Sequence, residues 1–314
     1  MNPTNHPGAS SEAAQAAHRV APADPGDFTL DRFGAIRHNF DSHPLMHLQQ
    51  LADFAKRLMS TRQCRFGVPG MTQTSAFKHT PKLPKGTTIE DVFARLQEPG
   101  SWLALYNVQT DPAYAGLLRE AIGSMHPLLA KEGHEVLLMT GFIFISSPPA
   151  FTPFHIDREN NFWLQISGRK IMTVFDRRDR ELVPAGDVEE FIVHGSLERV
   201  RLQEALRERG RSFEVGPGDG VYFPSTTPHM TETPVPTDES KAEVSISIGV
   251  NFYTTVTRRH ARVHQLNRVL RKWGLHPTPP GLQPLRDRIK EPMGYAVAAS
   301  RARWFDYTSP PAAF

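Results

Sequence analysis

The chain lacks several features that mark common classes of protein. It has a single cysteine, Cys64, among 314 residues, so no internal disulfide framework can form. No run of about 18 apolar residues is present, which argues against a membrane span. The N-terminus also lacks the basic and apolar regions of a secretory signal. We therefore expect a cytoplasmic protein that makes no membrane contact.

The chain also lacks a large excess of charge of either sign. The chain has 36 Lys and Arg against 33 Asp and Glu, a formal net charge of +3, which is too small to indicate a nucleic-acid partner. Hydrophobic residues at 39% and charged residues at 22% are typical of a globular protein. The 19 phenylalanines favour a packed, β-rich core, and no internal repeat is visible.

Four segments differ in pattern. Residues 1–26 are rich in Pro, Ala, Ser and Gly without periodicity, and we expect a flexible tail there. Residues 27–100 read as a helical and irregular segment, and 257–314 as a C-terminal helical segment. Between them, 101–256 form the expected barrel, and its polar stretch 176–212 is expected to be an insertion.

Helical spacing and start signals predict several helices. Apolar residues recur with helical period from Pro44 to Met59. Thr87 with Glu90 has the form of a capping box that opens a short helix to Gln97. Asp111 followed by Pro112 is a strong helix start. A further helix is expected inside the insertion. It would run from Leu197 to Arg209.

Short β segments dominate the middle of the chain. Separated by Gly, Pro and Asp turns, they favour a barrel or sandwich with flanking helices. A preceding strand is expected at Trp102–Asn107. The others are expected at Val136–Ser146, Thr152–Ile156, Asn161–Ile166, Arg169–Phe175, Val221–Pro224 and Val244–Tyr253.

An H-x-D pair, His155 and Asp157, lies at the end of the expected strand Thr152–Ile156. A nitrogen and an oxygen two residues apart on a strand share a face and lie roughly 7 Å apart along the backbone. A non-haem iron site needs two histidines and one carboxylate, with positions left open. The pair can supply two of these ligands, although with 14 histidines in the chain such pairs also arise by chance.

The third ligand must be a distant histidine. His229 is the best candidate, since we expect it in a loop at the end of a short strand that follows the Gly218-Asp219-Gly220 turn. His134, His194 and His260 compete with it but occupy polar or helical stretches. The alternative for His229 is a loop histidine without a ligand role.

Lys170 is the more discriminating residue. Both faces of its expected strand are largely apolar, so its ammonium should point into a covered space. A buried ammonium is costly unless an anion pairs with it, and no acidic residue of the strand can serve. A ligand carboxylate is the natural partner. The alternative is a strand-edge lysine that reaches water.

Polar residues on two further strands face the same expected space. Asn161 shares a strand face with Trp163, and Asn251 lies on the small, polar face of Val244–Tyr253. The opposite face of that strand is entirely apolar. A strand of this kind separates a hydrophobic core from a polar cavity, unless the polar side simply faces solvent.

The order of these residues resembles the JmjC/cupin-like oxygenases that depend on Fe(II) and 2-oxoglutarate. The pattern runs from Thr152-x-x-His155-x-Asp157 through Asn161 and Lys170 to His229 and Asn251. It is most similar to the branch of the factor-inhibiting asparaginyl hydroxylase and its bacterial cupin-like relatives. The resemblance covers about residues 100–255, and its most specific part is the spacing from His155 to Lys170. It implies a double-stranded β-helix, a jelly-roll barrel, with N-terminal and C-terminal helices.

The resemblance also implies roles for these residues. His155, Asp157 and His229 would be the iron ligands. Lys170 and Thr152 would hold the distal carboxylate of 2-oxoglutarate, and Asn161 and Asn251 would lie near its 1-carboxylate. Tyr106, on the strand before the barrel, would also face the cosubstrate.

The implied reaction is hydroxylation of a C–H bond with O₂, which releases succinate and CO₂. By analogy with the branch, the substrate would be an amino-acid side chain in a protein or peptide. Alternatives are hydroxylation or demethylation of a small molecule or nucleic acid, and a metal-dependent cupin enzyme that does not use 2-oxoglutarate. A non-catalytic binding module is a further alternative.

The arginines of residues 257–272 occupy several faces of the expected helix there. A solvated basic face is the simplest interpretation. A surface for an acidic partner and a homodimer contact through the C-terminal helices are the alternatives.

Overall fold

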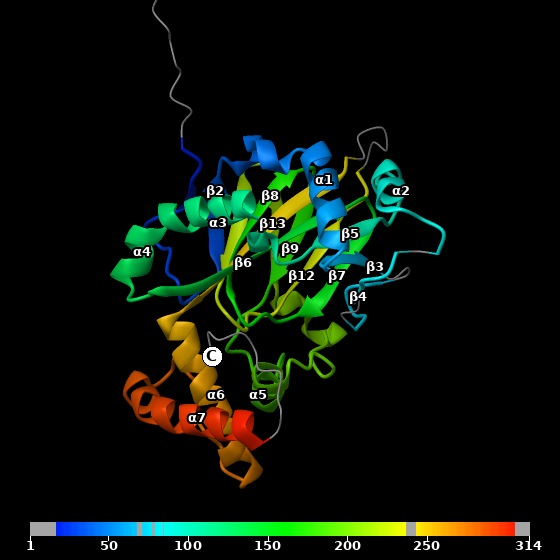
Figure 1. The fold of residues 1–314 in the computed structure, drawn as a ribbon. Helices are drawn as coiled ribbons and strands as arrows, with labels where there is room; N and C mark the ends of the chain where they lie inside the picture. The colour runs from blue at the N-terminus through cyan, green and yellow to red at the C-terminus, as the bar shows by residue number, and fades with distance from the viewer. Residues whose placement is uncertain (1–16, 68–70, 77–78, 84, 237–242, 305–314) are drawn as a thin grey trace, which may run out of the picture.

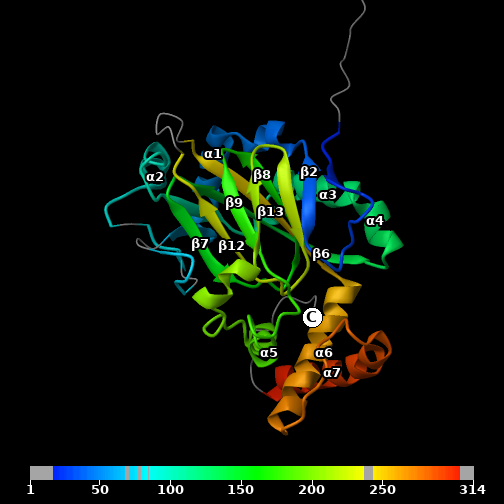
Figure 2. The ribbon, with the colours of Figure 1, turned by 180° about the vertical axis from the view of Figure 1, so that it is seen from behind.

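Two antiparallel β-sheets that face each other form the centre of the molecule (Figures 1 and 2). The computed structural model describes residues 17–67, 71–76, 79–83, 85–236 and 243–304. Eight strands build the barrel itself. They are β6 (Val136–Ser146), β7 (Ala150–His155), β8 (Asn160–Ser167), β9 (Lys170–Val174), β10 (Arg211–Val215), β11 (Asp219–Phe223), β12 (His229–Thr233) and β13 (Ser245–Thr254).

The order of the strands defines the topology. One sheet contains β11-β8-β13-β6 and the other β10-β9-β12-β7, and every pair is antiparallel. Successive strands alternate between the sheets, except at β9 and β10, which pair with each other. This is the double-stranded β-helix, a jelly roll. The predicted fold class, mainly β with flanking helices, is confirmed.

Five more strands extend the first sheet to nine. β5 (Trp102–Leu105) pairs with β6 and confirms the strand expected at Trp102–Asn107, two residues shorter at its end. The others come from segments whose sequence gave no strand signal, because each is short and lies toward an edge of the sheet. They are β1 (Val20–Pro22), β2 (Gly34–His38), β3 (Cys64–Gly67) and β4 (His79–Thr80).

Helices cover the outer face of this large sheet (Figure 1). Asp111 caps α3 by accepting the N–H of Ala113 at 3.0 Å, so the predicted helix start is correct. The capping box of α2 lies one residue later than expected, at Thr88 and Asp91. The helices are α1 (Leu48–Met59), α2 (Ile89–Ala94), α3 (Pro112–Ser124) and α4 (His126–Lys131), with 3₁₀ turns at Phe40–Ser42, Pro44–Met46 and Val108–Thr110.

Strand β13 divides the interior in two, as its alternation predicted. Ile246, Ile248 and Val250 are buried in the main hydrophobic core together with Phe54 of α1 and Leu118 of α3. Burying each such side chain contributes about 1.5–3 kcal/mol. The small and polar residues of the opposite face therefore point into the barrel.

The insertion at 176–212 contains a helix in a different place from the expected one. α5 spans Ala185–His194, and only Glu204–Arg209 of the expected Leu197–Arg209 helix is helical, as a 3₁₀ turn. α5 forms because Val188 and Ile192 bury a narrow apolar stripe against Phe154 and Phe175 of the barrel. Because charged residues occupy its other faces, the helical periodicity of this segment is not evident from the sequence.

Two long helices, α6 (Thr255–Lys272) and α7 (Pro284–Trp304), lie with α5 beyond one end of the barrel (Figures 1 and 2). Four arginines of α6 are paired with acidic side chains of α5 and α7, so the interpretation as a solvated basic face is wrong for these positions. Arg259 and Arg262 bind Glu291 of α7, while Arg268 and Arg271 bind Glu190 and Glu189 of α5. No helix among the described residues has both the length and the apolar character needed to cross a membrane.

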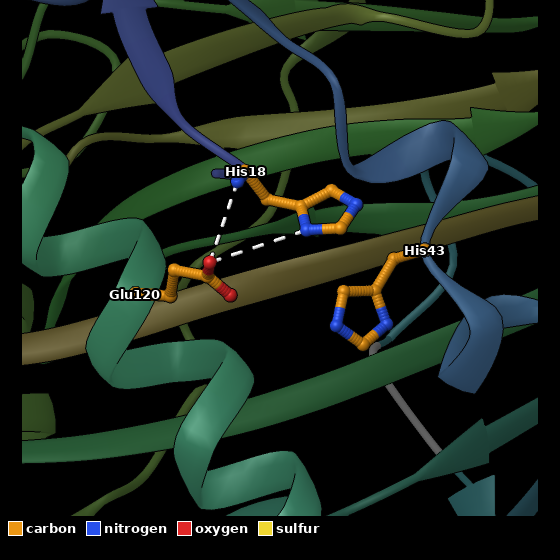
Figure 3. A group of neighbouring side chains, drawn as sticks. All are labelled: His18, His43 and Glu120. Carbon is orange, nitrogen blue, oxygen red and sulfur yellow. Dashed lines mark hydrogen bonds and ion pairs between the residues drawn. The ribbon is translucent and has the colours of Figure 1, made fainter. Parts of the chain in front are cut away.

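The N-terminal segment joins the sheet earlier than expected. The tail was expected to extend to residue 26, yet β1 pairs with β2 from Val20, whose side chain is 2% exposed. Figure 3 shows the neighbouring group of His18, His43 and Glu120. The backbone N–H of His18 donates to Glu120 at 3.3 Å, and Nδ1 of His43 accepts the N–H of Leu45 at 3.1 Å. The contact between His18 and Glu120 fastens the start of β1 to α3, whereas that of His43 caps the 3₁₀ turn Pro44–Met46.

Deleting residues 1–24 should therefore destabilise the protein rather than leave it unchanged. The loss of buried Val20 and of the β1–β2 ladder should lower the free energy of unfolding by about 2–4 kcal/mol, measured by urea denaturation. A variant lacking only residues 1–16, which removes no described residue, is the control. Equal midpoints for the two variants would contradict this role for β1.

Candidate active site

Strand pairing brings the two histidines and the aspartate together. His155 ends β7 and His229 begins β12, and the two lie opposite each other in the β7–β12 ladder. Asp157 follows two residues after β7. Its carboxylate oxygens lie 3.8 Å from Nε2 of His155 and 3.5 Å from Nε2 of His229. One ligand atom from each residue lies within 4.8 Å of the others, which is compatible with a shared metal ion.

The sequence placed His229 in a loop behind a strand, and this placement is wrong. It opens a strand of its own, β12, between β7 and β9. The loop before it is fixed to the other half of the site. Thr226, with a left-handed φ of 62°, donates its backbone N–H to the carbonyl of Asp157 at 2.8 Å. The hydrogen bond from Thr226 therefore ties the loop that leads to His229 to the backbone of Asp157.

Hydrogen bonds set the tautomers of both histidines. Nδ1 of His155 lies 2.7 Å from the carbonyl of Pro153, and Nδ1 of His229 lies 2.9 Å from the carbonyl of Thr227. A carbonyl only accepts, so each Nδ1 carries the hydrogen and each Nε2 keeps its lone pair. Burial and the neighbouring His155 lower the pKa of His229 to about 4, which keeps the ring neutral near pH 7. Both rings thus present the form that a metal requires.

A cavity of about 300 Å³ connects the triad to Lys170. The Lys170 side chain lies inside the barrel and is 2% exposed, so the expectation of a covered ammonium agrees with its position. Nζ donates to the hydroxyl of Ser146 at 3.2 Å. Burial alone lowers the pKa of Lys170 to about 7. A buried amine of this kind is stabilised by an incoming anion.

The other residues singled out in the sequence are not all in the wall of this cavity. Thr152, 7% exposed, lines it and accepts the indole N–H of Trp102 at 3.4 Å. Asn161 lines it as well, and its Oδ1 has no partner. Asn251 is opposite Asn161 in the β8–β13 ladder, fully buried, with neither amide atom paired, but it is not part of the lining. Tyr106 lines the cavity, and burial raises its pKa.

The register of the strands orders the cavity from end to end. On the β9 side, His229 pairs with Val174, four residues or about 13 Å of strand from Lys170. On the β13 side, Ser245 pairs with Ser146, the contact of Lys170, and Tyr253 lies eight residues beyond it. Lys170 therefore lies at one end of these strands, with His229 about four residues and Tyr253 about eight residues further along.

The acidic lining residue Glu159 escaped the sequence analysis, which placed Tyr253 only at the end of the polar face of its strand. Glu159 lies in the bend between β7 and β8, two residues after Asp157, and accepts the hydroxyl hydrogen of Tyr253 at 2.7 Å. Burial and the neighbouring Asp157 carboxylate raise the pKa of Glu159 to about 7. The available signal was its place in the H-x-D segment, but nothing in the sequence pairs it with Tyr253.

Neither models of protein families nor curated proteins match the chain. Solved structures similar to it include YcfD, a ribosomal oxygenase from Escherichia coli, at 15% identity and a TM-score of 0.43 over 88% of this chain and 66% of that one. A structure of YcfD with cobalt and 2-oxoglutarate has 17% identity and a TM-score of 0.43, covering 87% and 64%. One with cobalt and succinic acid has 18% identity and a TM-score of 0.39, covering 81% and 59%.

The chain thus spans about three fifths of the length of the solved structures that it resembles. Similarity at this level does not establish a shared activity. The strand order of its own two sheets identifies the chain as a double-stranded β-helix protein with a metal-compatible His-Asp-His triad inside the barrel.

Proposed function

We propose that the protein is an Fe(II)- and 2-oxoglutarate-dependent oxygenase that hydroxylates a C–H bond. One observation carries the proposal: a single cavity contains both a two-histidine, one-carboxylate triad and a buried ammonium. The triad alone suits many metal enzymes. Burying the Lys170 ammonium costs solvation free energy, and an anionic ligand that enters the same cavity would offset that cost.

His155, Asp157 and His229 would hold the iron. Their fixed Nε2 lone pairs and the carboxylate converge on one point, and a facial arrangement of three ligands leaves positions open for small molecules. The carbonyls behind Nδ1 of each ring orient it and raise its basicity.

Lys170 and Thr152 would bind the distal carboxylate of 2-oxoglutarate at one end of the cavity. Asn161, whose Oδ1 has no partner, would face the other end of the cosubstrate. Asn251 lies opposite Asn161 in the β8–β13 ladder but outside the wall of the cavity, so we assign the contact with the cosubstrate to Asn161 alone.

When bound, iron with 2-oxoglutarate and O₂ supplies the oxidising power that inserts one oxygen atom into a C–H bond and leaves succinate and CO₂. The chain's own residues orient the components and exclude water. Phe142, Phe144 and Trp163 form apolar walls of the cavity, which shield the reacting centre. Lys170 fixes the cosubstrate through a charge-assisted contact.

The substrate would be an amino-acid side chain of a protein or peptide. A cavity of about 300 Å³ that must also accommodate a five-carbon keto-diacid would leave space for one side chain rather than for a nucleotide. The reaction would take place in the cytoplasm, where a reducing environment keeps Fe(II) and the thiol of Cys64 reduced.

Succinate release tests the proposal directly. The protein is incubated with Fe(II), 2-oxoglutarate and O₂, with and without protein extract of the native host, and the extract is then searched for a mass increase of one oxygen atom. Succinate formation should require all three components. Turnover of a substrate without 2-oxoglutarate would instead indicate a cupin enzyme of another type.

We also propose that α7 forms a homodimer contact. Leu285, Ile289 and Met293 follow one another at helical spacing and are 76%, 68% and 53% exposed, an unusual density of apolar surface. Ile289→Asp should convert a dimer into a monomer, measured by light scattering after gel filtration. Arg288→Asp places the same acid on the neighbouring exposed position as a control. A monomeric parent protein would refute the contact.

A further inference from the structure

We propose that a second, smaller cavity binds one monovalent anion of about the size of chloride. The cavity lies between the insertion, the loop before β12 and α6, and among the described residues it shares no wall with the cavity that contains the triad. Its basic lining residues are Arg177, Arg178, Arg180, His260 and His264. Such a site would support the metal centre rather than take part in the reaction.

The size of this cavity limits the ligand that it can hold. Its volume is about 30 Å³, and one bound water requires roughly 10–15 Å³ of such space. A chloride ion is only slightly larger than a water molecule, so it fits. A phosphate ester or a nucleotide is too large.

The wall of the cavity carries basic side chains and, among the described residues, no acidic one. A guanidinium has N–H donors and no acceptor, so the arginines disfavour a metal cation and suit an anion. Two of the three arginines are partly neutralised, because Arg177 and Arg178 both bind the carboxylate of Asp31, Arg177 at 2.5 Å. One carboxylate therefore serves two guanidinium groups.

Arg180 is the least compensated of the three arginines. Its one hydrogen bond among the described residues is long, 3.5 Å to a backbone carbonyl, and its Nε has none. The charges of Glu189 and Asp176 act on it, but Glu189 pairs with Arg271 at 3.0 Å and Asp176 is exposed. Burial and the neighbouring Arg177 outweigh these carboxylates and lower the pKa of Arg180. An anion in the cavity would supply the missing negative charge.

His264 adds a buried nitrogen without a partner. Its side chain is 4% exposed, and its Nδ1 makes no hydrogen bond within the part of the chain that the structure describes. Burial and the nearby Arg180 lower the pKa of His264 well below its usual value, so the ring is neutral near pH 7. A neutral imidazole carries one N–H, and in the Nδ1–H form it would donate that hydrogen to the anion.

The same cavity borders the loop that leads into β12, since Ser225 and Thr226 line it. Thr226 donates its backbone N–H to the carbonyl of Asp157 at 2.8 Å. Ser225 donates its own to Oδ1 of Asn160 at 3.0 Å. An anion bound between this loop and His264 of α6 would therefore stabilise the segment that carries Asp157. Anion binding and metal binding should then strengthen each other.

Bromide, which can replace chloride and scatters X-rays anomalously, locates the site directly. Crystals of the protein are soaked in sodium bromide, and an anomalous difference peak is expected between Arg180 and His264. In solution, thermal unfolding of the metal-free protein is compared at equal ionic strength in sodium chloride and in sodium methanesulfonate, whose anion is too large for the cavity. The midpoint should rise saturably with chloride, by about 3 °C at ten times the dissociation constant.

Two variants separate the site from general effects of salt. Arg180→Gln removes the least compensated charge and should abolish the rise of the midpoint with chloride. Arg199→Gln, at an exposed arginine of the same insertion outside the cavity wall, should retain it. In the parent protein, cobalt should bind at least about fivefold more tightly in chloride than in methanesulfonate.

Three results would overturn the anion site: a water molecule without bromide in the cavity, equal midpoints in the two salts, or a chloride effect that persists in Arg180→Gln. If that variant does not fold, the bromide map of the parent protein decides alone. Chloride binding with unchanged affinity for cobalt would refute the link to the metal centre. Absence of cobalt binding in both salts would count against the proposed function and not against the anion site.

Discussion

Asp157→Ala should abolish stoichiometric metal binding and with it all succinate release. The aspartate is the only carboxylate of the triad, and its two oxygens face both histidines at 3.8 and 3.5 Å. Two neutral imidazoles without the anionic ligand bind a hard divalent ion weakly. We expect the affinity for Co(II), used as a stand-in for Fe(II), to fall by at least about a hundredfold, the upper range for even a supporting residue of a metal site.

The fold should survive this change. The Asp157 side chain is 25% exposed and lies beyond the end of β7. Its backbone carbonyl, which accepts the N–H of Thr226, is retained in the alanine variant. Cobalt titration followed by visible absorbance measures the effect, with unfolding of the metal-free protein as the check on folding. Asp53→Ala, at an exposed aspartate of α1, serves as the control. Full stoichiometry in Asp157→Ala would refute the ligand assignment.

The sequence alone predicted correctly the features that depend on residues close together in the chain. The alternation in β13 separated core from cavity without any knowledge of the partners of the strand, since successive residues of a strand face opposite sides. The apolar character of both faces of β9 likewise predicted that Lys170 points into a covered space. His155 and Asp157 are two residues apart, and Asp111 caps an N–H two residues further on, so short-range geometry fixed both features as well.

The rest depends on contacts between distant segments. β12 runs from His229 to Thr233 between Pro228 and Pro234 and has no strand pattern of its own. It forms because β7 and β9 both offer it a pairing edge, from 74 and 55 residues away at the His155 and Val174 positions. The Glu159–Tyr253 bond spans 94 residues. Such pairs follow from the topology rather than from any window of sequence.

Lys170→Met should stabilise the empty protein and at the same time weaken its binding of 2-oxoglutarate. Burial lowers the pKa of Lys170 from 10.5 to about 7, so the folded state holds the charged form at a cost that the unfolded state does not have. Below pH 7 the lysine is protonated in both states and the cost is present in full. Methionine of similar length removes it, and we expect a gain of about 1–4 kcal/mol in the free energy of unfolding near neutral pH.

The gain should disappear as the pH rises. Between pH 7 and 10.5 the unfolded state binds a proton at this lysine and the folded state does not, so the stability of the parent protein increases with pH. The methionine variant lacks this dependence, and the two unfolding curves should converge toward pH 10.5. Ser146 keeps a hydrogen bond to Thr233 at 2.9 Å in the variant, so no hydroxyl is left unpaired.

Cosubstrate binding should change in the opposite direction. Truncating one partner of a buried charge pair costs about 2–4 kcal/mol of binding. In the parent protein at pH 8.5, a carboxylate that enters beside Lys170 restores the ammonium, so 2-oxoglutarate should bind with uptake of a proton. Calorimetry in buffers of different ionisation enthalpy measures that uptake, with cobalt in the metal site.

Lys131→Met, at an exposed lysine that ends α4, should change neither stability nor proton uptake. The two effects of Lys170→Met must occur together, because both arise from one ammonium that is uncompensated until the cosubstrate arrives. A variant that is stabilised but binds 2-oxoglutarate normally would mean that the lysine is only a buried residue of the barrel. A variant that loses binding without any gain in stability would mean that the ammonium is already neutralised in the empty protein.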